Sequence, residues 1–273
     1  AAPSAAPLEA PLVAALLADR GASGRITVVS ECDSTNRIAA SLPASSSDPA
    51  GWTAVAADRQ TAGRGRLDRR WESPGNSGLM FSVLVDAGGP AAVRSVPLAP
   101  LAAGVGVVRA CRSHGAAVGL KWPNDVIADA ARRPTDPWKA GGILAELVRR
   151  GIVMGIGLNV DLDSGVAPVP QAVGLRALGL APGLRREELL VDVVVAVVAA
   201  WALLRRDRAA LLAEYRTLCR TIGAQVEIDR PDGSALCGVA TGVDDDGHLI
   251  VASSGGEQSV TVGDVVHLRA AGV

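Results

Sequence analysis

The chain has 273 residues, a mass of 27.7 kDa and a formal net charge of −1, which suggests one large domain or two unequal ones. Hydrophobic residues make up 49% of the sequence and charged residues 20%, a composition that argues against extensive disorder. The near-neutral charge also argues against a protein whose whole surface grips nucleic acid.

Neither a membrane span nor a disulfide framework is expected. The longest apolar run, Val193 to Leu204, is shorter than the roughly 20 residues that cross a bilayer, and therefore predicts a buried helix. Residues 1–11 lack the basic stretch of a signal peptide. Four cysteines lie far apart without a CxxC pair, which favours small buried thiols over zinc ligands. We therefore expect a cytoplasmic protein.

The first two thirds of the chain predict alternating helices and strands. Residues 1–24 are interpreted as a tail with one short helix, 8–20. The elements expected next are a strand at 26–29, a helix opened by Asp33-Ser34-Thr35, strands at 53–57 and 79–85, an apolar helix at 96–114, a strand at 118–120, strands at 143–148 and 152–158 joined by a hairpin turn, and helices at 186–205 and 208–221.

The character of the sequence changes after residue 221. Short β-type runs occur there at close spacing, separated by turn sequences such as Pro-Asp-Gly and Asp-Asp-Asp-Gly; this pattern is typical of a small β-barrel. The runs lie at 225–228, 236–242, 249–252, 259–262 and 265–268. We therefore expect three parts, namely an N-terminal tail and helix at 1–24, a main domain at 25–221 and a β-barrel at 222–273.

Common nucleotide and hydrolase motifs such as GxxxxGK[ST], GxGxxG, HExxH and GxSxG are missing, so other segments must carry the chemistry. The first is Gln60 to Arg66, continuing to Arg69-Arg70-Trp71, where glycines alternate with arginines after a strand. Glycine lets the backbone approach a ligand closely, and arginine offers a fork of donors for phosphate or carboxylate. An exposed basic loop or a nucleic-acid contact remains an alternative.

Three further segments are candidates. Lys121 to Asp125 combines an ammonium, an amide and a carboxylate in one turn, which suits Mg²⁺ near phosphates or, alternatively, a surface ion pair. Lys139 to Glu146 places a lysine and two glycines before a buried strand, as at a carboxylate site or an ordinary hairpin entry. Gly155 to Asn159 has glycines within a strand, which mark close approach of a ligand or backbone.

Taken together and in this order, these segments resemble the biotin protein ligases. Ser34-Thr35-Asn36 and the C-terminal run Gly263 to Arg269 match as well, so the resemblance covers roughly residues 26–270. It implies an α+β fold, with a central mixed sheet, helices on one side and a small SH3-like barrel at the C-terminus. It also implies a two-step reaction, in which ATP and biotin give biotinyl-5′-AMP and a carrier lysine then takes the biotin.

The resemblance also implies roles for individual residues. Lys139, Arg64 and Arg66 are the catalytic candidates, because cations stabilise charge that develops in both transfers. The biotin-binding candidates are Ser34, Thr35, Asn36, Gln60, Gly63, Arg64, Gly65, Arg66, Lys139 and Gly142. The candidates for ATP and adenylate are Arg66, Arg69, Trp71, Lys121, Asn124, Asp125 and Asn159. Asp125 is also the candidate ligand for Mg²⁺, and the expected partner is a biotin carboxyl carrier domain.

Two departures and several alternatives accompany this reading. Fewer than about 30 residues precede the first strand, too few for the winged-helix repressor domain of many relatives, so we expect no DNA binding. Residues 128–138 lengthen a connection that we interpret as a surface loop. A lipoate–protein ligase and a non-catalytic biotin-sensing regulator remain alternatives. The group that deprotonates the acceptor lysine, either Lys139 or Asp125, is left open, as are the oligomeric state and the particular carrier.

Overall fold

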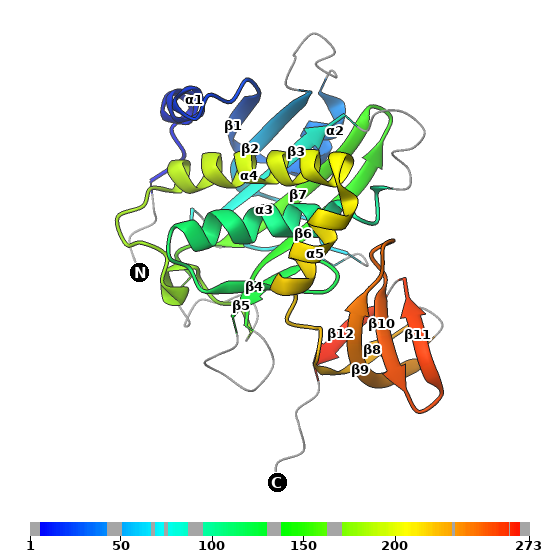
Figure 1. The fold of residues 1–273 in the computed structure, drawn as a ribbon. Helices are drawn as coiled ribbons and strands as arrows, with labels where there is room; N and C mark the ends of the chain where they lie inside the picture. The colour runs from blue at the N-terminus through cyan, green and yellow to red at the C-terminus, as the bar shows by residue number, and fades with distance from the viewer. Residues whose placement is uncertain are drawn as a thin grey trace.

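The computed structural model describes residues 6–42, 51–66, 69–73, 76–86, 95–129, 138–162, 171–230, 233–261 and 263–267. They form a seven-stranded sheet covered by helices, followed by a smaller five-stranded sheet at the C-terminal end (Figure 1).

The large sheet has the strand order β1-β2-β3-β7-β6-β5-β4. Its first pair, β1 and β2, is parallel, and all other neighbours are antiparallel, so the expected mixed sheet is confirmed. Its strands are β1 (Arg25–Cys32), β2 (Trp52–Gln60), β3 (Gly78–Val85), β4 (Val118–Lys121), β5 (Asp125–Ala128), β6 (Lys139–Val148) and β7 (Gly151–Asn159).

Helices cover one face of this sheet, as expected. In Figure 1, α3 (Ala99–Ser113) and α4 (Arg186–Arg206) lie side by side across it, with α1 (Ala10–Asp19) near β1 and α5 (Arg208–Leu218) near β4. A short 3₁₀ helix, η2 (Arg176–Leu178), precedes α4. The exception is α2 (Thr35–Ser41), whose Ala39 packs with residues of β2, β3 and β7 in a separate small cluster. This helix therefore lies on the opposite face.

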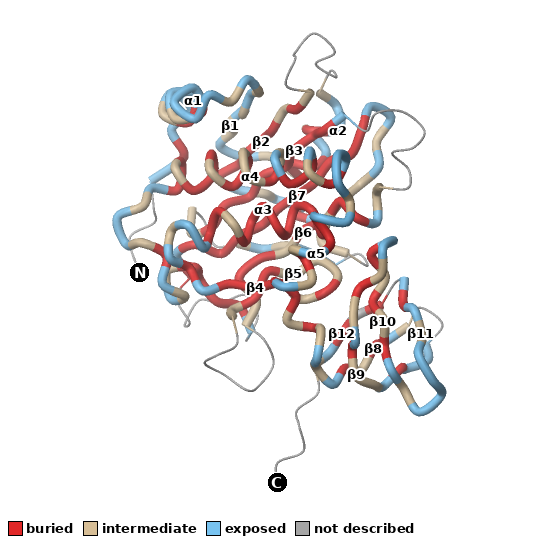
Figure 2. Tube along the Cα trace, in the orientation of Figure 1, coloured by how far each residue is buried: buried red, intermediate tan, exposed pale blue. Residues whose placement is uncertain are grey.

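The main core lies between the sheet and the helices. Every residue of β3 and of β7 is buried because these central strands are covered on both faces. Figure 2 shows the resulting band of buried residues through the centre of the molecule. The apolar run of 193–204 belongs to α4, and none of the helices in the described ranges is long and apolar enough to cross a membrane.

The C-terminal sheet has the order β11-β10-β9-β8-β12, with all neighbours antiparallel. Its strands are β8 (Gln225–Asp229), β9 (Ala235–Val243), β10 (Leu249–Ser253), β11 (Gly256–Val260) and β12 (Asp264–His267). The five predicted strands and the small β domain are thus present. Within the described residues, β11 and β12 are the two edges of this sheet, so the observed pairing does not close a barrel.

The N-terminal segment packs against the main domain. Leu8, Val13 and Leu17 belong to the same core cluster as the large sheet, and the Leu8 N–H donates to the buried carboxylate of Asp58. Arg186 of α4 forms a buried ion pair with the same carboxylate, at 3.2 Å. The predicted loop at 128–138 falls largely outside the described residues.

Candidate active site

A cavity of about 680 Å³ opens over the sheet on the face opposite to α3 and α4. Every site residue predicted from the sequence lines this cavity except Gly63, which lies at its margin beside Arg64. Six cationic side chains contribute to the lining, against three carboxylates. The cations are Arg64, Arg66, Arg69, Arg70, Lys121 and Lys139, and the carboxylates are Glu72, Asp125 and Asp229. The cavity therefore favours an anionic ligand.

Glycines form part of the cavity floor. A Cβ atom at Gly157 would lie 2.4 Å from the indole of Trp71, and one at Gly142 would lie 3.3 Å from it. The missing side chains thus let the indole lie directly on β6 and β7. The Trp71 Nε1–H is buried and finds no hydrogen-bond partner among the described residues. An unpaired buried donor is costly, and within the described part of the chain this N–H is such an unsatisfied polar group in the floor of the cavity.

Lys139 and Asp125 form an ion pair beside this floor. The Lys139 Nζ lies 2.6 Å from Asp125 Oδ1 and 5.9 Å from the centre of the Trp71 ring. The lysine begins β6 and the aspartate begins β5, so sheet pairing brings together residues that the sequence places in separate segments. Asn159 supports the pair from β7, because its Nδ2 donates to the Lys139 carbonyl at 3.3 Å.

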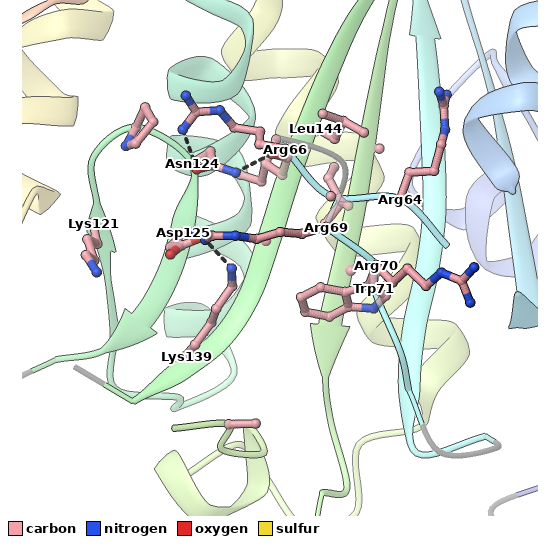
Figure 3. A pocket seen from close by; sticks show the side chains of 18 of the residues that line it. Arg64, Arg66, Arg69, Arg70, Trp71, Lys121, Asn124, Asp125, Lys139 and Leu144 are labelled. Carbon is pink, nitrogen blue, oxygen red and sulfur yellow. Dashed lines mark hydrogen bonds and ion pairs between the residues drawn. The ribbon is translucent and has the colours of Figure 1, made fainter. Parts of the chain in front are cut away.

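Arg66 and Asn124 meet on the other side of the ion pair. The Arg66 guanidinium donates to Asn124 Oδ1 at 3.3 Å, and Asn124 Nδ2 donates to the Ile143 carbonyl at 2.8 Å. Figure 3 shows Arg66 directed toward Asn124, and Arg69 directed toward Asp125. Lys121 lines the cavity from the edge strand β4. We call the segment Gln60 to Arg66, together with Arg69 to Trp71, the Gly/Arg loop. Its second part and the Lys121–Asp125 turn therefore form one end of the cavity.

The other end is lined by residues of α2 and β2, with β3 behind them. Gln60 Oε1 accepts from the Thr35 N–H at 2.8 Å, and the Thr35 hydroxyl lies 2.8 Å from the Ser82 hydroxyl. Ser34 is the N-cap residue of α2, and its side chain makes no cap hydrogen bond. Ser82 does not line the cavity but supports Thr35 from β3; it was not predicted, although a lone hydroxyl within the apolar run of β3 is an available signal for it.

The C-terminal domain closes one side of the cavity. Asp229, Val265 and Val266 line it from β8 and β12. The buried indole of Trp122 donates to the carbonyl of Gly247 at 2.9 Å, which ties the Lys121–Asp125 turn to the turn between β9 and β10. Sequence reasoning did not find these contacts, because their partners lie 125 residues apart in the chain.

Comparison with known proteins identifies the family. Residues 29–163 match the model of the Biotin/lipoate A/B protein ligase family, and residues 221–268 match that of the Biotin protein ligase C terminal domain. A biotin–[acetyl-CoA-carboxylase] ligase of Mycobacterium tuberculosis is 34% identical over 90% of both chains. A ligase of the same description from Paracoccus denitrificans is 28% identical over 87% of this chain and 98% of its own.

Solved structures agree with this match. A biotin protein ligase from Aquifex aeolicus in complex with biotin and ATP superimposes with a TM-score of 0.72 at 25% identity, over 90% of this chain and 99% of that one. The fold and these matches thus define a protein ligase of the biotin and lipoate class. The chain belongs to the biotin protein ligase family, as the sequence motifs indicated.

Proposed function

We propose that this chain activates biotin with ATP to give biotinyl-5′-AMP and transfers the biotin to a lysine of a biotin carboxyl carrier domain. The observation that carries the proposal is the cavity itself, which joins the Gly/Arg loop, the Lys139–Asp125 pair and the Lys121–Asp125 turn in a member of this family. The match to the biotin-specific C-terminal domain supports biotin over lipoate.

In this proposal, biotin lies at the end built by α2 and the first part of the Gly/Arg loop. Its polar ring system would meet the side chains of Ser34, Thr35 and Gln60, and the backbone of Gly63 to Gly65. The hydroxyl and amide groups there include both donors and acceptors. The chain of the ligand would lie over the Trp71 indole, which Gly142 and Gly157 allow to lie directly on the sheet, and its carboxylate would point to Lys139.

ATP takes the other end in the same proposal. Arg66, Arg69 and Lys121 supply positive charge for the phosphates, and Asn124 and Asn159 supply amides. Trp71 offers a broad apolar surface for adenine and an unpaired N–H. A nucleotide hydrogen bond to this N–H would require the indole to shift, because the N–H is buried against β7.

The chemistry then follows from charge. An oxygen of the biotin carboxylate attacks the α-phosphorus of ATP, and the bond from that phosphorus to pyrophosphate breaks. The Lys139 ammonium stabilises the negative charge that develops between the reacting groups. The carrier amine next attacks the acyl carbon, AMP leaves with the bonding electrons, and the amine releases its proton. Since Lys139 is already ion-paired with Asp125, we assign the lysine an electrostatic role rather than that of the base.

The lining fits Mg²⁺ that arrives with ATP. Mg²⁺ is commonly held by one or two carboxylates together with substrate phosphates, and Asp125 is the carboxylate at the proposed phosphate end. Among the described residues, no cluster of three or more His, Cys, Asp or Glu could hold a metal without substrate. Bound Mg²⁺ would neutralise phosphate charge as pyrophosphate leaves.

We also propose that the parts of the chain divide as predicted, with the catalytic domain at 25–221 and the C-terminal domain at 222–273, but with the helix of the N-terminal part docked on the catalytic domain. The core position of Leu8, Val13 and Leu17 supports this. A cytoplasmic location is proposed from cysteine use, since all four thiols are free. Burial raises the pKa of Cys111 to about 12, so that thiol stays protonated in the core.

The proposed function is tested by identifying the product of the reaction. The full chain is incubated with a biotin carboxyl carrier domain, ATP, Mg²⁺ and biotin, and the carrier is weighed by mass spectrometry. We expect the mass of one biotinyl group on one lysine, together with pyrophosphate release that depends on biotin. A parallel reaction with lipoate serves as the control. Modification by lipoate but not by biotin would contradict the proposal.

A further inference from the structure

A chain of hydrogen bonds runs from the middle of the sheet to the first arginine of the Gly/Arg loop. The buried Ser82 hydroxyl donates to Asn36 Oδ1 at 2.6 Å, and Asn36 Nδ2 donates to Glu146 Oε2 at 2.6 Å. Both carboxylate oxygens of Glu146 then accept from Arg64 Nη2, at 2.8 and 2.7 Å. Asn36 is 5% exposed and Ser82 is fully buried. The first two residues of this series of hydrogen bonds are therefore held in place by the packing around them.

The Asn36 amide occupies a space that a glycine in β7 leaves open. A Cβ atom at Gly155 would lie 2.0 Å from Asn36 Oδ1, so the amide fits only because β7 has a glycine at this position. Asn36 Nδ2 also lies 3.4 Å from the Leu144 carbonyl. The Nδ2 donors of this amide, and one of the two hydrogen bonds that its oxygen can accept, are thus directed at the protein.

Arg64 and Arg66 consequently differ in what their side chains contact. Arg66 is directed at Asn124, whereas Arg64 points away from the Lys139–Asp125 pair (Figure 3). The backbone beside Arg64 is also tied, since the Trp71 N–H donates to the Gly63 carbonyl at 3.0 Å and the Gly65 N–H donates to the Arg69 carbonyl at 2.7 Å. The first part of the loop is therefore held from both its side chain and its backbone.

We propose that Glu146 is a positioning residue for the biotin end of the cavity. It acts through Arg64, with Asn36 and Ser82 behind it, and so keeps the backbone of Gly63 to Gly65 in the shape that biotin meets. This inference rests on the proposed function. Holding the loop before the ligand arrives reduces the ordering cost of binding, so Glu146 sets the affinity for biotin without touching biotin or ATP.

The variant Glu146→Gln tests this geometry with little change of volume. The carboxylate accepts from two donors, Arg64 and Asn36, whereas a glutamine has one oxygen and turns an NH₂ group toward one of them. The pair is partly exposed, at 49% for Arg64 and 30% for Glu146, which moderates the effect. We expect the KM for biotin in pyrophosphate release to rise about fivefold to tenfold, the scale of a weakened charge-assisted hydrogen bond. The KM for ATP should stay within twofold.

The chain offers a matched control. Arg59 and Glu31 form another Arg–Glu pair across neighbouring strands, at 2.5 Å, and neither residue lines the cavity. Glu31→Gln should leave both KM values unchanged. A second variant separates positioning from simple damage. In Asn36→Asp combined with Glu146→Gln, the carboxylate at position 36 accepts from the new amide, and the glutamine oxygen still accepts from Arg64, so the KM for biotin should return toward the wild-type value.

The outcomes separate the two proposals. Wild-type chain that releases no pyrophosphate with biotin and ATP overturns the proposed function and this inference with it. Active wild-type chain with an unchanged KM for biotin in Glu146→Gln overturns the inference alone. Equal increases in the KM for biotin and for ATP, or a double variant no better than the single one, would also overturn it, because positioning of the biotin end predicts a selective and reversible effect.

Discussion

The contact between Trp122 and Gly247 allows the coupling between the C-terminal domain and the active site to be measured. Trp122 lies between Lys121 and Asn124, and its indole N–H donates to the carbonyl of Gly247 at 2.9 Å in a buried environment. Its backbone N–H donates to the Thr221 hydroxyl at 3.0 Å. The variant Trp122→Phe removes the indole donor and leaves the Gly247 carbonyl without it.

The size of the effect can be isolated with a second tryptophan. Trp201 is 4% exposed and Trp122 is 2% exposed, but the Trp201 Nε1–H finds no partner among the described residues. Each Trp→Phe change loses similar apolar volume. Only Trp122→Phe also breaks a hydrogen bond, which costs about 1–3 kcal/mol when it leaves a buried group unpaired. We therefore expect Trp122→Phe to lower the free energy of unfolding by about that much more than Trp201→Phe.

The same contact predicts a change in activity. If the C-terminal domain holds the turn that carries Asn124 and Asp125, loosening it by about 1 kcal/mol should raise the KM for ATP about fivefold, with a smaller change in the KM for biotin. Denaturant unfolding gives the first quantity and pyrophosphate release gives the second. Equal losses of stability in Trp122→Phe and Trp201→Phe, together with equal KM values for ATP, would refute the reasoning.

Three further predictions concern single residues. Lys139→Ala should keep its fold by circular dichroism but slow single-turnover pyrophosphate release by about 10²–10³, as expected when one charge stabiliser is lost; a change below threefold would contradict the electrostatic role. Arg66→Gly removes the contact to Asn124 and adds backbone freedom, so biotinyl-5′-AMP should still form but leave faster and label an added inert protein; an unchanged off-rate contradicts this. For Asp244, desolvation raises the pKa, but the His248 N–H, the His248 ring and further hydrogen bonds outweigh it, so the net pKa is lowered. Its stabilisation is present above the ordinary carboxyl pKa and is lost as pH falls through the lowered value, so the Tm difference between wild type and Asp244→Asn should shrink below about pH 4.

The order of helices and strands could be read from local patterns. The runs at 79–85 and 152–158 are short, apolar and bounded by turn residues, and they became β3 and β7 with boundaries close to those predicted. The strand β5 (Asp125–Ala128) was missed, because its four residues follow a proline-containing turn and have no periodicity of their own. It is a strand because β4 and β6 pair with it on both sides.

The site was predictable as a set of segments but not as a set of contacts. Motif order indicated which residues gather around the cavity, and all but Gly63 line it. The motif Ser34-Thr35-Asn36 indicated three residues of the cavity and all three line it, but it gave no sign that the Asn36 amide also bonds Glu146 of β6 and packs against Gly155 of β7. The partners of the Asn36 side chain depend on which strands lie beside α2. The order of strands in this mixed sheet cannot be predicted from any local stretch of sequence.

The two supports of the cavity have different origins. The proposed biotin end is held within the large sheet, by a chain of contacts from Ser82 through Asn36 and Glu146 to Arg64. The proposed ATP end is held from outside the sheet, because Trp122 is bonded to Gly247 of the C-terminal domain. Lys139 lies between the two and is fixed by Asp125 and by Asn159. In the proposed reaction the carboxylate and the α-phosphate meet at this lysine, so both supports would act at once, which would give a physical reason for the C-terminal domain to be packed against the catalytic one.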